Sequence, residues 1–531
     1  MDPISASNYN LRACEDDKGE TDAVKAAVST KSLSRFEEKS LKNLLPQITA
    51  TLIVTSNHIV VGIGLAYSAI LIPQLEGPGS DIPVTKDNLS WIASVVALVA
   101  PIGSMMSGFV MDRIGRINTL KISIVPGILG WVLMAVAQNI PMLIAGRILT
   151  GIATTLSTSP AIVYITEIAR KDMRGSLLVI GPAFVSLGLV ITYLKGWLMD
   201  WRTIAWLCNV YLIIPFFLLF LLPESPSWLV SKGRPEEAGK ALHWLHKHQP
   251  KPDPQDNKTF AEMYLNLLVK EDTQKKIEAQ TSGGNMVKEF LKPTGYKPLL
   301  IISGVFFFQQ FSGIYIFLFY SVTFFEAVGS DINPYVASIW IGVIRLILSI
   351  MNTWLLKYFS RRKLIMISAF GMFVCTLISG LFTHWIKNGT TEAKWVPVIF
   401  LLLYVVSSMI GLLTIPWTMT AELFPLKIRS MAHSISTSIV NLIMFVAVQN
   451  YINLERLLGG SAGIQWFFSV VSLVTVVYIF VVLPETHKKK LSEIEDYFNS
   501  NTIYLWSTKR TRDVSKNSSS RNEADKLING V

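Results

Sequence analysis

The sequence contains few cysteines and few charged residues for a chain of 531 residues. Its three cysteines, Cys14, Cys208 and Cys375, are scattered, whereas a disulfide framework or a zinc site needs paired, closely spaced ligands. Charged residues make up only 16% of the chain, compared with about 25% in soluble domains. Metal-ligand clusters and a Gly-x-x-x-x-Gly-Lys phosphate loop are also missing. These absences argue against a soluble globule and an enzyme, and they predict neither a cofactor nor a bound metal.

Long hydrophobic runs are the main feature that is present. They recur from Pro46 to Leu483, and each is long enough to cross a bilayer core of about 30 Å. We therefore predict an all-α polytopic membrane protein with twelve transmembrane helices. The predicted spans are 47–74, 88–110, 118–138, 141–166, 176–197, 203–222, 296–327, 334–359, 363–386, 396–420, 430–454 and 462–483.

The loops between these spans differ in their content of Lys and Arg. One set of alternate loops contains twelve, including Arg113 and Arg361, and the other contains six, including Lys86 and Arg202. The positive-inside rule places the richer set in the cytoplasm, and an even number of spans puts both termini there. Residues 1–45 are polar and contain no visible signal peptide, so we expect the first span to direct insertion. The net charge of +11 then reflects orientation, and no nucleic-acid partner is expected.

A polar stretch divides the chain into two halves of six spans each. The predicted parts are an N-terminal cytoplasmic tail (1–45), a first half (46–222), a cytoplasmic helical linker (223–295), a second half (296–483) and a C-terminal cytoplasmic tail (484–531). In the linker, Glu236–His248 and Thr259–Gln280 have helical apolar spacing. The composition of Lys509–Asn522 predicts disorder. Two similar halves are typical of a transporter whose site lies between them near the bilayer midplane.

Short motifs of acidic, basic, glycine and proline residues occur at the span ends, several of them in both halves. They are Gly108-x-x-x-Asp112-Arg113-x-Gly115-Arg116, Gly146-Arg147, Tyr164-Ile165-Thr166-Glu167 with Arg174-Gly175, Pro223-Glu224-Ser225-Pro226-Ser227-Trp228-Leu229, Gln309-Gln310-x-Ser312-Gly313, Pro416-Trp417, Glu422-Leu423-Phe424-Pro425 and Pro484-Glu485-Thr486. With these motifs in this order along the chain, the sequence resembles the sugar porter family of the major facilitator superfamily. Within that family it is most similar to the facilitated trehalose and glucose transporters. The resemblance implies uniport of a sugar by alternating access.

The resemblance also implies a network of ion pairs that closes the cytoplasmic side while the site faces outward. The residues that it assigns to this network are Asp112, Arg113, Arg116, Glu167, Arg174, Glu224, Glu422, Arg429 and Glu485. In the second half, Lys357 and Tyr358 replace an acidic and a basic residue of the family, so the network is one carboxylate short. Alternatively, these charges only anchor the span ends in the membrane interface.

Substrate contacts are also implied by the resemblance. Gln309, Gln310 and Asn441 match amides that bind sugar hydroxyls, and an amide both donates and accepts hydrogen bonds. Trp417 matches a tryptophan whose face packs against a sugar ring. Helical spacing places Tyr320 on the same face as Gln309, so we include it in the predicted site. The alternative is that the amides are buried and bond neighbouring helices.

Four matched positions depart from the family. Pro182 replaces a glutamine, Tyr315 and Arg345 replace asparagines, and Leu442 replaces a tryptophan. Arg345 lies mid-span on a polar helical face, which contains Ser338, Gly342, Arg345, Ser349 and Asn352. A charge at this depth costs several kcal/mol unless it is paired or hydrated, and no span carries an Asp or Glu at comparable depth.

Three interpretations of Arg345 follow from this position. It donates to sugar hydroxyls in a pocket that Tyr315 reshapes, it pairs with the carboxylate of an organic anion, or it ties helices through backbone carbonyls and Asn352. The framework of the family favours a sugar over an organic anion as the substrate. A sensor that binds sugar without transporting it stays open as well, because the site and the second-half network are altered.

The first span indicates whether transport is coupled to the movement of protons. Proton-coupled members of the family carry an Asp where this chain has Ser68, and the span contains no Asp or Glu. Serine does not carry a proton at physiological pH, so we predict facilitated diffusion. His58 is the one titratable group in the span, and it is either an alternative proton site or a packed neutral histidine.

Glycan acceptor motifs serve as markers of the outer side. Asn388 and Asn88 begin Asn-x-Ser/Thr motifs in loops predicted to lie outside the cell, and we expect the protein in the plasma membrane. The expected partners are a small-molecule sugar and the lipid bilayer. The sequence does not predict an oligomeric state.

Overall fold

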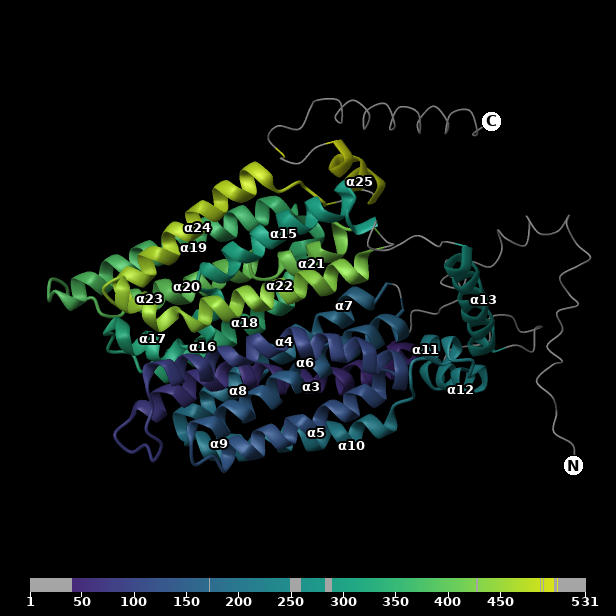
Figure 1. The fold of residues 1–531 in the computed structure, drawn as a ribbon, viewed down its shortest axis with the longest axis horizontal. Coiled ribbons are helices and arrows are strands. Elements are labelled where there is room, and N and C mark those ends of the chain that lie inside the picture. The colour runs from purple at the N-terminus through teal and green to yellow at the C-terminus, as the bar shows by residue number, and fades with distance from the viewer. Residues whose placement is uncertain are drawn as a thin grey trace, which may run out of the picture. The chain divides into compact units, whose positions relative to one another are not determined.

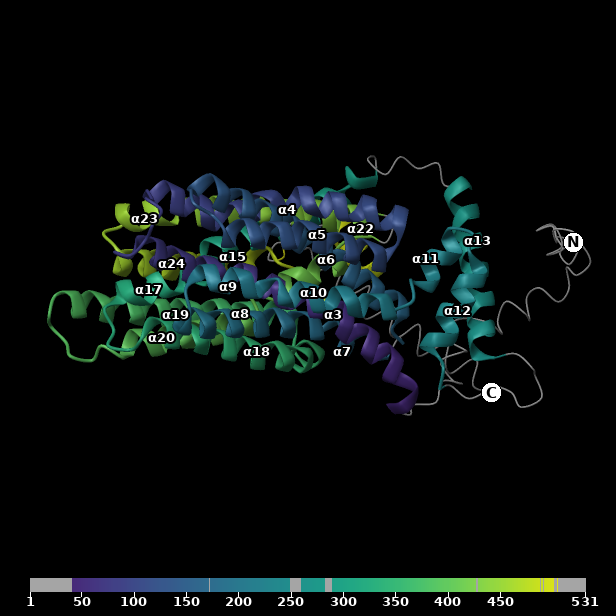
Figure 2. The same ribbon diagram turned by 90° about the horizontal axis from the view of Figure 1, so that it is seen from below.

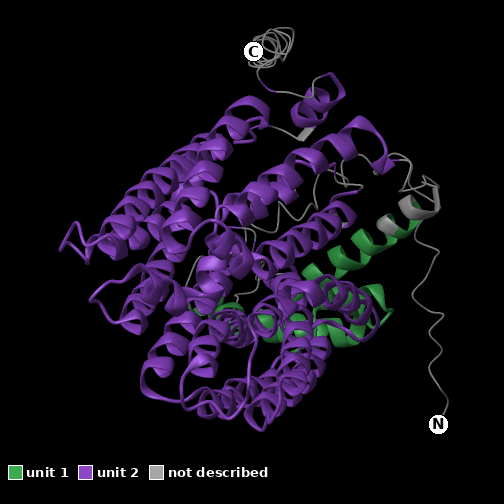
Figure 3. Cartoon of the chain, turned by 60° about the vertical axis from the view of Figure 1, so that its left-hand side comes forward, with its two compact units in different colours: residues 1–50, 223–283 green, residues 51–222, 284–531 purple. Residues whose placement is uncertain are grey.

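The protein is helical in the computed structural model. The model describes residues 41–170, 172–248, 259–281, 289–425, 428–487, 489, 491–500 and 504. No strand occurs in these residues, and the predicted all-α membrane fold is confirmed. The chain divides into two compact units, one made of residues 1–50 and 223–283 and the other of residues 51–222 and 284–531 (Figure 3). The predicted tail segment Lys509–Asn522 lies outside the described residues.

The first half is built from long helices with polar residues at their outer ends. Its elements are α3 (Leu41–Glu76), α4 (Lys86–Ile114), α5 (Arg116–Ala135), α6 (Ile140–Ile168), α7 (Arg174–Leu178), α8 (Ile180–Leu198), α9 (Trp201–Cys208), α10 (Val210–Leu218) and the 3-10 turn η2 (Leu219–Leu221). The side chain of Asn139 caps α6 by accepting from Met142 N at 3.0 Å. Asp200 caps α9 in the same way, and hydrogen bonds from Thr203 hold the pKa of its carboxyl below the usual value.

The second half repeats this arrangement with more interruptions. Its elements are α15 (Pro293–Phe311), α16 (Ile314–Phe319), α17 (Ser321–Val328), α18 (Pro334–Tyr358), α19 (Arg361–Lys387), α20 (Val396–Ile410), α21 (Ile415–Glu422), α22 (Arg429–Gln449), α23 (Tyr451–Leu457) and α24 (Ser461–Val482). Figure 1 shows these helices in green and yellow and those of the first half in purple and blue. A further helix, α25 (Leu491–Ser500), packs on α15, where Lys297 Nζ donates to Phe498 O at 2.9 Å.

Eleven helical segments in the described part are long and apolar enough to cross a membrane. The protein is an integral membrane protein with multiple transmembrane helices. The seventh predicted span, 296–327, differs because it is divided into α15, α16 and α17. Its first break lies at Gly313, whose φ of 90° disfavours other residues, and a Cβ there would lie 2.6 Å from the ring of Phe468. Hydrophobicity alone did not reveal this interruption.

The two halves pack against each other through two pairs of helices. α8 lies against α18, and α4 lies against α22, as the view from below shows (Figure 2). The α8 and α18 backbones approach so closely at Gly342 that a Cβ there would lie 2.9 Å from Val190 N. Ser94 Oγ donates to Gln449 Oε1 at 2.5 Å between α4 and α22. Gln449 lies at the outer end of its helix, whereas Val190 lies near the middle of α8.

The smaller unit is a helical cluster with its own apolar core. It contains α11 (Pro226–Ser231), α12 (Pro235–Leu245) and α13 (Phe260–Thr281), close to the two helical segments predicted in the linker. Trp228 and Ala241 lie in its core, with Leu265 packed against them. His246 packs against the ring of Phe260, with the centroids 4.8 Å apart, and burial lowers its pKa to about 4.

Candidate functional site

The two predicted amides of α15 are fully buried at the break between α20 and α21. Gln309 Nε2 donates to the carbonyl oxygens of Leu412 and Leu413 at 2.6 and 3.1 Å. Gln310 Nε2 donates to Gln309 Oε1 at 3.1 Å, whereas Gln310 Oε1 has no partner among the described residues. Gln309 therefore ties two helices together, and Gln310 presents an acceptor that can receive a hydrogen bond from a ligand.

Aromatic side chains lie next to these amides. Trp417 on α21 is half-buried and packs on Phe306, with the ring centroids 5.2 Å apart. Tyr315 on α16 is half-buried, and its side chain lies near that of Trp417. Asn441 on α22 is half-buried, and its Nδ2 donates to Thr437 O of its own helix at 2.7 Å. Trp417 and Phe306 thus form an aromatic pair with Tyr315 nearby, and the Asn441 side chain keeps an amide oxygen that can accept a hydrogen bond.

Tyr320 occupies a different place from the other predicted substrate residues. Its hydroxyl donates to Val448 O at 3.4 Å, and its ring lies 4.6 Å from the ring of Tyr451. The hydroxyl also lies near Ser90 of α4 in the first half. Trp91 and Phe445 pack beside this contact with their centroids 5.7 Å apart. The structure therefore puts Tyr320 in the outer contact between the halves.

Arg345 is buried with only 9% of its surface exposed. Its Nε has no hydrogen-bond partner, and it forms no ion pair with a carboxylate in the described part of the chain. The ionisable groups that interact with its charge are Tyr315 and Tyr193. Asn352 donates instead to Met409 O at 2.8 Å. The tie between Arg345 and Asn352 that the spacing allowed is therefore absent.

A second buried arginine, Arg147 on α6, has a different environment. Its Nε donates to Ile92 O at 3.1 Å, its Nη1 to Gly64 O at 2.8 Å and its Nη2 to Ser68 Oγ at 2.6 Å. All three nitrogens are thus used within the first half, and α3, α4 and α6 are joined. The serine at the family's proton-carrying position is a partner of this guanidinium. His58 is also buried on α3, and its Nδ1 has no partner in the described residues.

The predicted network of the first half, at the end of the helices opposite Asn139 and Asp200, contains a bidentate ion pair. Arg116 donates to both carboxylate oxygens of Glu167, from Nε at 3.0 Å and from Nη2 at 2.8 Å. Arg113 lies over the ring of Phe109, 3.9 Å from its centroid. Of the other residues predicted for this network, Asp112 is exposed and Arg174 is half-buried. Glu224 is half-buried and belongs to the smaller unit.

The network of the second half is centred on Arg361, which the sequence did not assign to it. Arg361 Nη2 donates to Glu422 Oε1 at 3.2 Å, and its Nη1 contacts His487 Nδ1. Glu485 accepts from the backbone N–H of Arg361 at 3.1 Å. Arg429 donates to Phe424 O at 3.3 Å. Arg361 and His487 stand next to recognised motifs, and this proximity was the signal that could have identified them.

Residues 24–498 match the protein-family model described as "Sugar (and other) transporter". The chain belongs to this sugar transporter family. This family membership confirms the predicted resemblance to sugar porters. The members with known names that resemble this chain are themselves transporters.

Relatives within the sugar transporter family include two named "Facilitated trehalose transporter Tret1". The protein from Culex quinquefasciatus is 32% identical over 463 residues, which cover 86% of this chain and 87% of the relative. The protein from Polypedilum vanderplanki is 31% identical over 453 residues, which cover 85% of this chain and 87% of the relative.

Solved structures with the same fold include the xylose transporter XylE from E. coli. Its inward-open conformation matches with a TM-score of 0.68 and 20% identity, covering 84% of this chain and 98% of that one. The proton:xylose symporter XylE bound to 6-bromo-6-deoxy-D-glucose matches with a TM-score of 0.65 and 21% identity, covering 86% and 100%. These structures show that the chain has the major facilitator fold.

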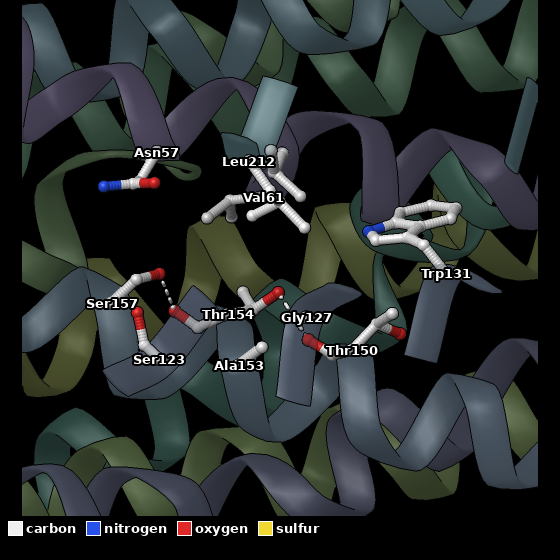
Figure 4. A pocket seen from close by; sticks show the side chains of 11 residues that line it. Asn57, Val61, Ser123, Gly127, Trp131, Thr150, Ala153, Thr154, Ser157 and Leu212 are labelled. Atoms are coloured by element: carbon white, nitrogen blue, oxygen red, sulfur yellow. Dashed lines mark hydrogen bonds between the residues drawn. The ribbon is translucent and has the colours of Figure 1, made fainter. Parts of the chain in front are cut away.

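A small polar cavity of about 10 Å³ lies within the first half of this sugar transporter, apart from the predicted substrate residues (Figure 4). Asn57 and Trp131 line it, and neither the Asn57 amide nor Trp131 Nε1 has a hydrogen-bond partner in the described residues. The volume is sufficient for about one water molecule. The cavity is too small for a sugar.

The two predicted glycan acceptors differ in exposure. Asn388 is exposed at the end of α19, and its Nδ2 contacts His384 Nε2 at 2.9 Å. Asn88 is half-buried in the first turn of α4, and its backbone N–H donates to Thr85 Oγ1 at 3.3 Å. A glycosyltransferase reaches an exposed turn more easily than a helical residue, so Asn388 is the better acceptor.

Proposed function

We propose that this sugar transporter is a facilitative carrier that moves a sugar such as trehalose or glucose down its gradient. The observation that carries the proposal is the pairing of Arg147 with Ser68. A buried guanidinium whose partners are two carbonyl oxygens and a hydroxyl has no group beside it that takes up a proton at physiological pH. The names of the trehalose-transporting relatives support the same substrate class.

The proposed mechanism is alternating access between the two halves. In this structure the two halves meet toward their outer ends through Ser94 with Gln449 and through the packing of Trp91 on Phe445. We assign the substrate to the space near Gln310, Trp417, Tyr315 and Asn441, and we assign Gln309 to positioning. The cytoplasmic networks centred on Arg116 and Arg361 close the opposite side in the outward-facing state. Both termini then lie in the cytoplasm, and the carrier lies in the plasma membrane.

The direct test is uptake of labelled trehalose and glucose into proteoliposomes, with and without an imposed pH gradient. A uniporter equilibrates the sugar at a rate that the gradient does not change. Accumulation above the external concentration when the inside is alkaline would instead establish proton coupling and direct attention to His58. Binding of sugar without any uptake would identify a sensor.

The site assignment is tested separately with Trp417→Ala and Gln310→Ala. Loss of the indole face and of the amide acceptor is expected to raise the half-saturating sugar concentration about tenfold in each variant. Trp354→Ala is the matched control, because Trp354 on α18 is 76% exposed. Wild-type uptake by both site variants, with equal amounts of protein in the membrane, would remove these residues from the site.

A further inference from the structure

The buried guanidinium of Arg345 makes none of the contacts that ordinarily hold such a group in a membrane protein. Buried arginines pair with acids or donate to backbone carbonyls, as Arg147 does with all three nitrogens. Arg345 makes no hydrogen bond or ion pair with a described residue, and its Nε is enclosed. Its two terminal nitrogens are not among the enclosed atoms, so they can meet water or a ligand, and no acidic side chain in the described residues compensates the charge.

The position of Arg345 relates this charge to the proposed sugar site. One turn toward the outer end of α18, Gly342 is in close contact with Val190 of α8. Further outward, Ser338 Oγ donates to Ser321 Oγ at 3.1 Å. Arg345 therefore lies one turn inward of the Gly342 contact between the halves, and Tyr315, which neighbours Trp417, lies near its guanidinium.

We propose that Arg345 is the anion-binding residue of the central site, and that the carrier accepts sugars bearing a carboxylate. This inference rests on the proposed function, because it uses the same site. The sugar ring packs on Trp417, a ring hydroxyl donates to Gln310 Oε1, and the carboxylate pairs with the Arg345 guanidinium. The Tyr315 hydroxyl lies on the same side and donates a further hydrogen bond.

A carboxylate fits this environment better than a hydroxyl for an electrostatic reason. Arginine presents a planar fork of donors that matches the two oxygens of a carboxylate. An anionic ligand also compensates a charge that has no acidic partner in the described residues, whereas a neutral hydroxyl leaves that charge uncompensated. The two tyrosines near Arg345 add no negative charge at neutral pH, and the Tyr193 hydroxyl already donates to Leu318 O at 3.2 Å.

Glucose and glucuronate are the probes that isolate this effect, because they differ only in the group at C6. Competition against a labelled sugar in proteoliposomes measures the affinity for each. For the wild type, we expect glucuronate to bind about tenfold more tightly than glucose, which corresponds to one charge-assisted interaction. Arg345→Gln is expected to reverse this order while glucose still binds.

Two further variants separate charge from structure. Arg345→Lys keeps the charge but loses the fork of donors, so we expect it to retain part of the preference for glucuronate. Arg456→Gln removes one positive charge from an exposed position on α23 in the same half and is expected to keep the wild-type preference. Thermal melting of each purified variant, with and without glucuronate, shows whether the protein is folded and whether it binds.

An electrical readout provides an independent measurement. Uniport of glucuronate moves one negative charge, so an inside-positive membrane potential is expected to increase its accumulation. The same potential is expected to leave glucose uptake unchanged. A response of glucuronate that disappears in Arg345→Gln supports the assignment.

Three results would overturn the inference. Glucose uptake that glucuronate does not inhibit would reject the carboxylate and leave the proposed sugar carrier intact. Equal loss of glucose and glucuronate binding in a folded Arg345→Gln variant would show that Arg345 binds sugar hydroxyls. A wild-type protein that transports neither glucose nor trehalose and binds none of these sugars would reject the proposed function as well.

Discussion

The two halves each bury an arginine within a membrane-spanning helix, and they use it in opposite ways. Arg147 on α6 is fully enclosed and donates to α3 and α4 through three hydrogen bonds. Arg345 on α18 is similarly buried but has no hydrogen bond in the described part of the chain. A saturated guanidinium holds helices together, whereas an unsaturated one destabilises the protein until a ligand compensates it. The comparison separates a charge that the protein satisfies from one that it leaves unpaired in the described residues.

Replacing the structural arginine is expected to have the largest effect. Arg147→Gln removes the three hydrogen bonds from the guanidinium to Ile92 O, Gly64 O and Ser68 Oγ, and a hydrogen bond from a charged group contributes about 1.5–3 kcal/mol. We expect the free energy of unfolding to fall by about 3 kcal/mol or more, with a clear loss of folded carrier. Thermal melting in detergent measures this, with the exposed Arg456→Gln as control. A wild-type melting temperature would mean that Arg147 does not hold the half together.

The close approach between the halves is expected to give the next largest effect. A Cβ at Gly342 would lie 2.9 Å from Val190 N, so Gly342→Ala should destabilise the closed outer contact by about 1–2 kcal/mol. The population of the outward-open state then rises without unfolding. Spin labels on cysteines introduced at Asp87 and Asn450 measure this as a longer distance. Gly64→Ala is the control, because a Cβ there meets no atom within 4 Å. Equal distances in both variants would contradict the role of this contact.

The cytoplasmic networks offer a smaller contrast between the halves. Arg116 and Glu167 form a bidentate pair at 2.8 and 3.0 Å, whereas Arg361 and Glu422 form a single contact at 3.2 Å with a more exposed carboxylate. We expect Glu167→Gln to lower the maximal uptake rate about fivefold and Glu422→Gln about twofold, because exposed pairs contribute less. Uptake at saturating sugar measures both rates. A larger effect of Glu422→Gln would reverse the proposed order.

The functional arginine should have the smallest effect on stability. Arg345→Gln removes a largely buried, unpaired charge and leaves no described acceptor unsatisfied, so the free energy of unfolding is expected to rise or to change by less than about 1 kcal/mol. The same melting experiment as for Arg147→Gln measures it. A loss as large as that of Arg147→Gln would show that both arginines tie helices, and the contrast between the halves would disappear.

Much of the fold followed from the sequence, and the exceptions have local causes. Long apolar runs and their basic flanks were sufficient to locate the spans, because a helix must satisfy its own backbone hydrogen bonds in lipid. The break in the seventh span was missed, since Gly313 interrupts the helix without lowering its hydrophobicity. Motif matching found Glu167 and Glu422 as candidates, but it omitted Arg361, which lies in no acidic motif.

The candidate site was predictable in its composition and not in its contacts. Spacing placed Tyr320 and Gln309 on one helical face, yet their hydrogen bonds go to Val448 and Leu412 on different elements. Helical periodicity predicts on which side of its own helix a residue lies, but not which other element that side contacts. The neighbour in that direction depends on how the helices cross and where they break, and the sequence pattern contains neither.

The sequence by itself determined the membrane class, the two halves and the position of Arg345 within a span, because these depend on transfer of side chains from water to a nonpolar medium. Only the tertiary structure decided that Arg147 is satisfied by Ile92, Gly64 and Ser68 while Arg345 is not. Hydrogen bonds are short and directional, so they depend on atoms brought together from distant segments. The composition of a segment indicates whether its residues lie in the membrane. Whether a buried charge finds hydrogen-bond partners depends on which segments the fold brings next to it.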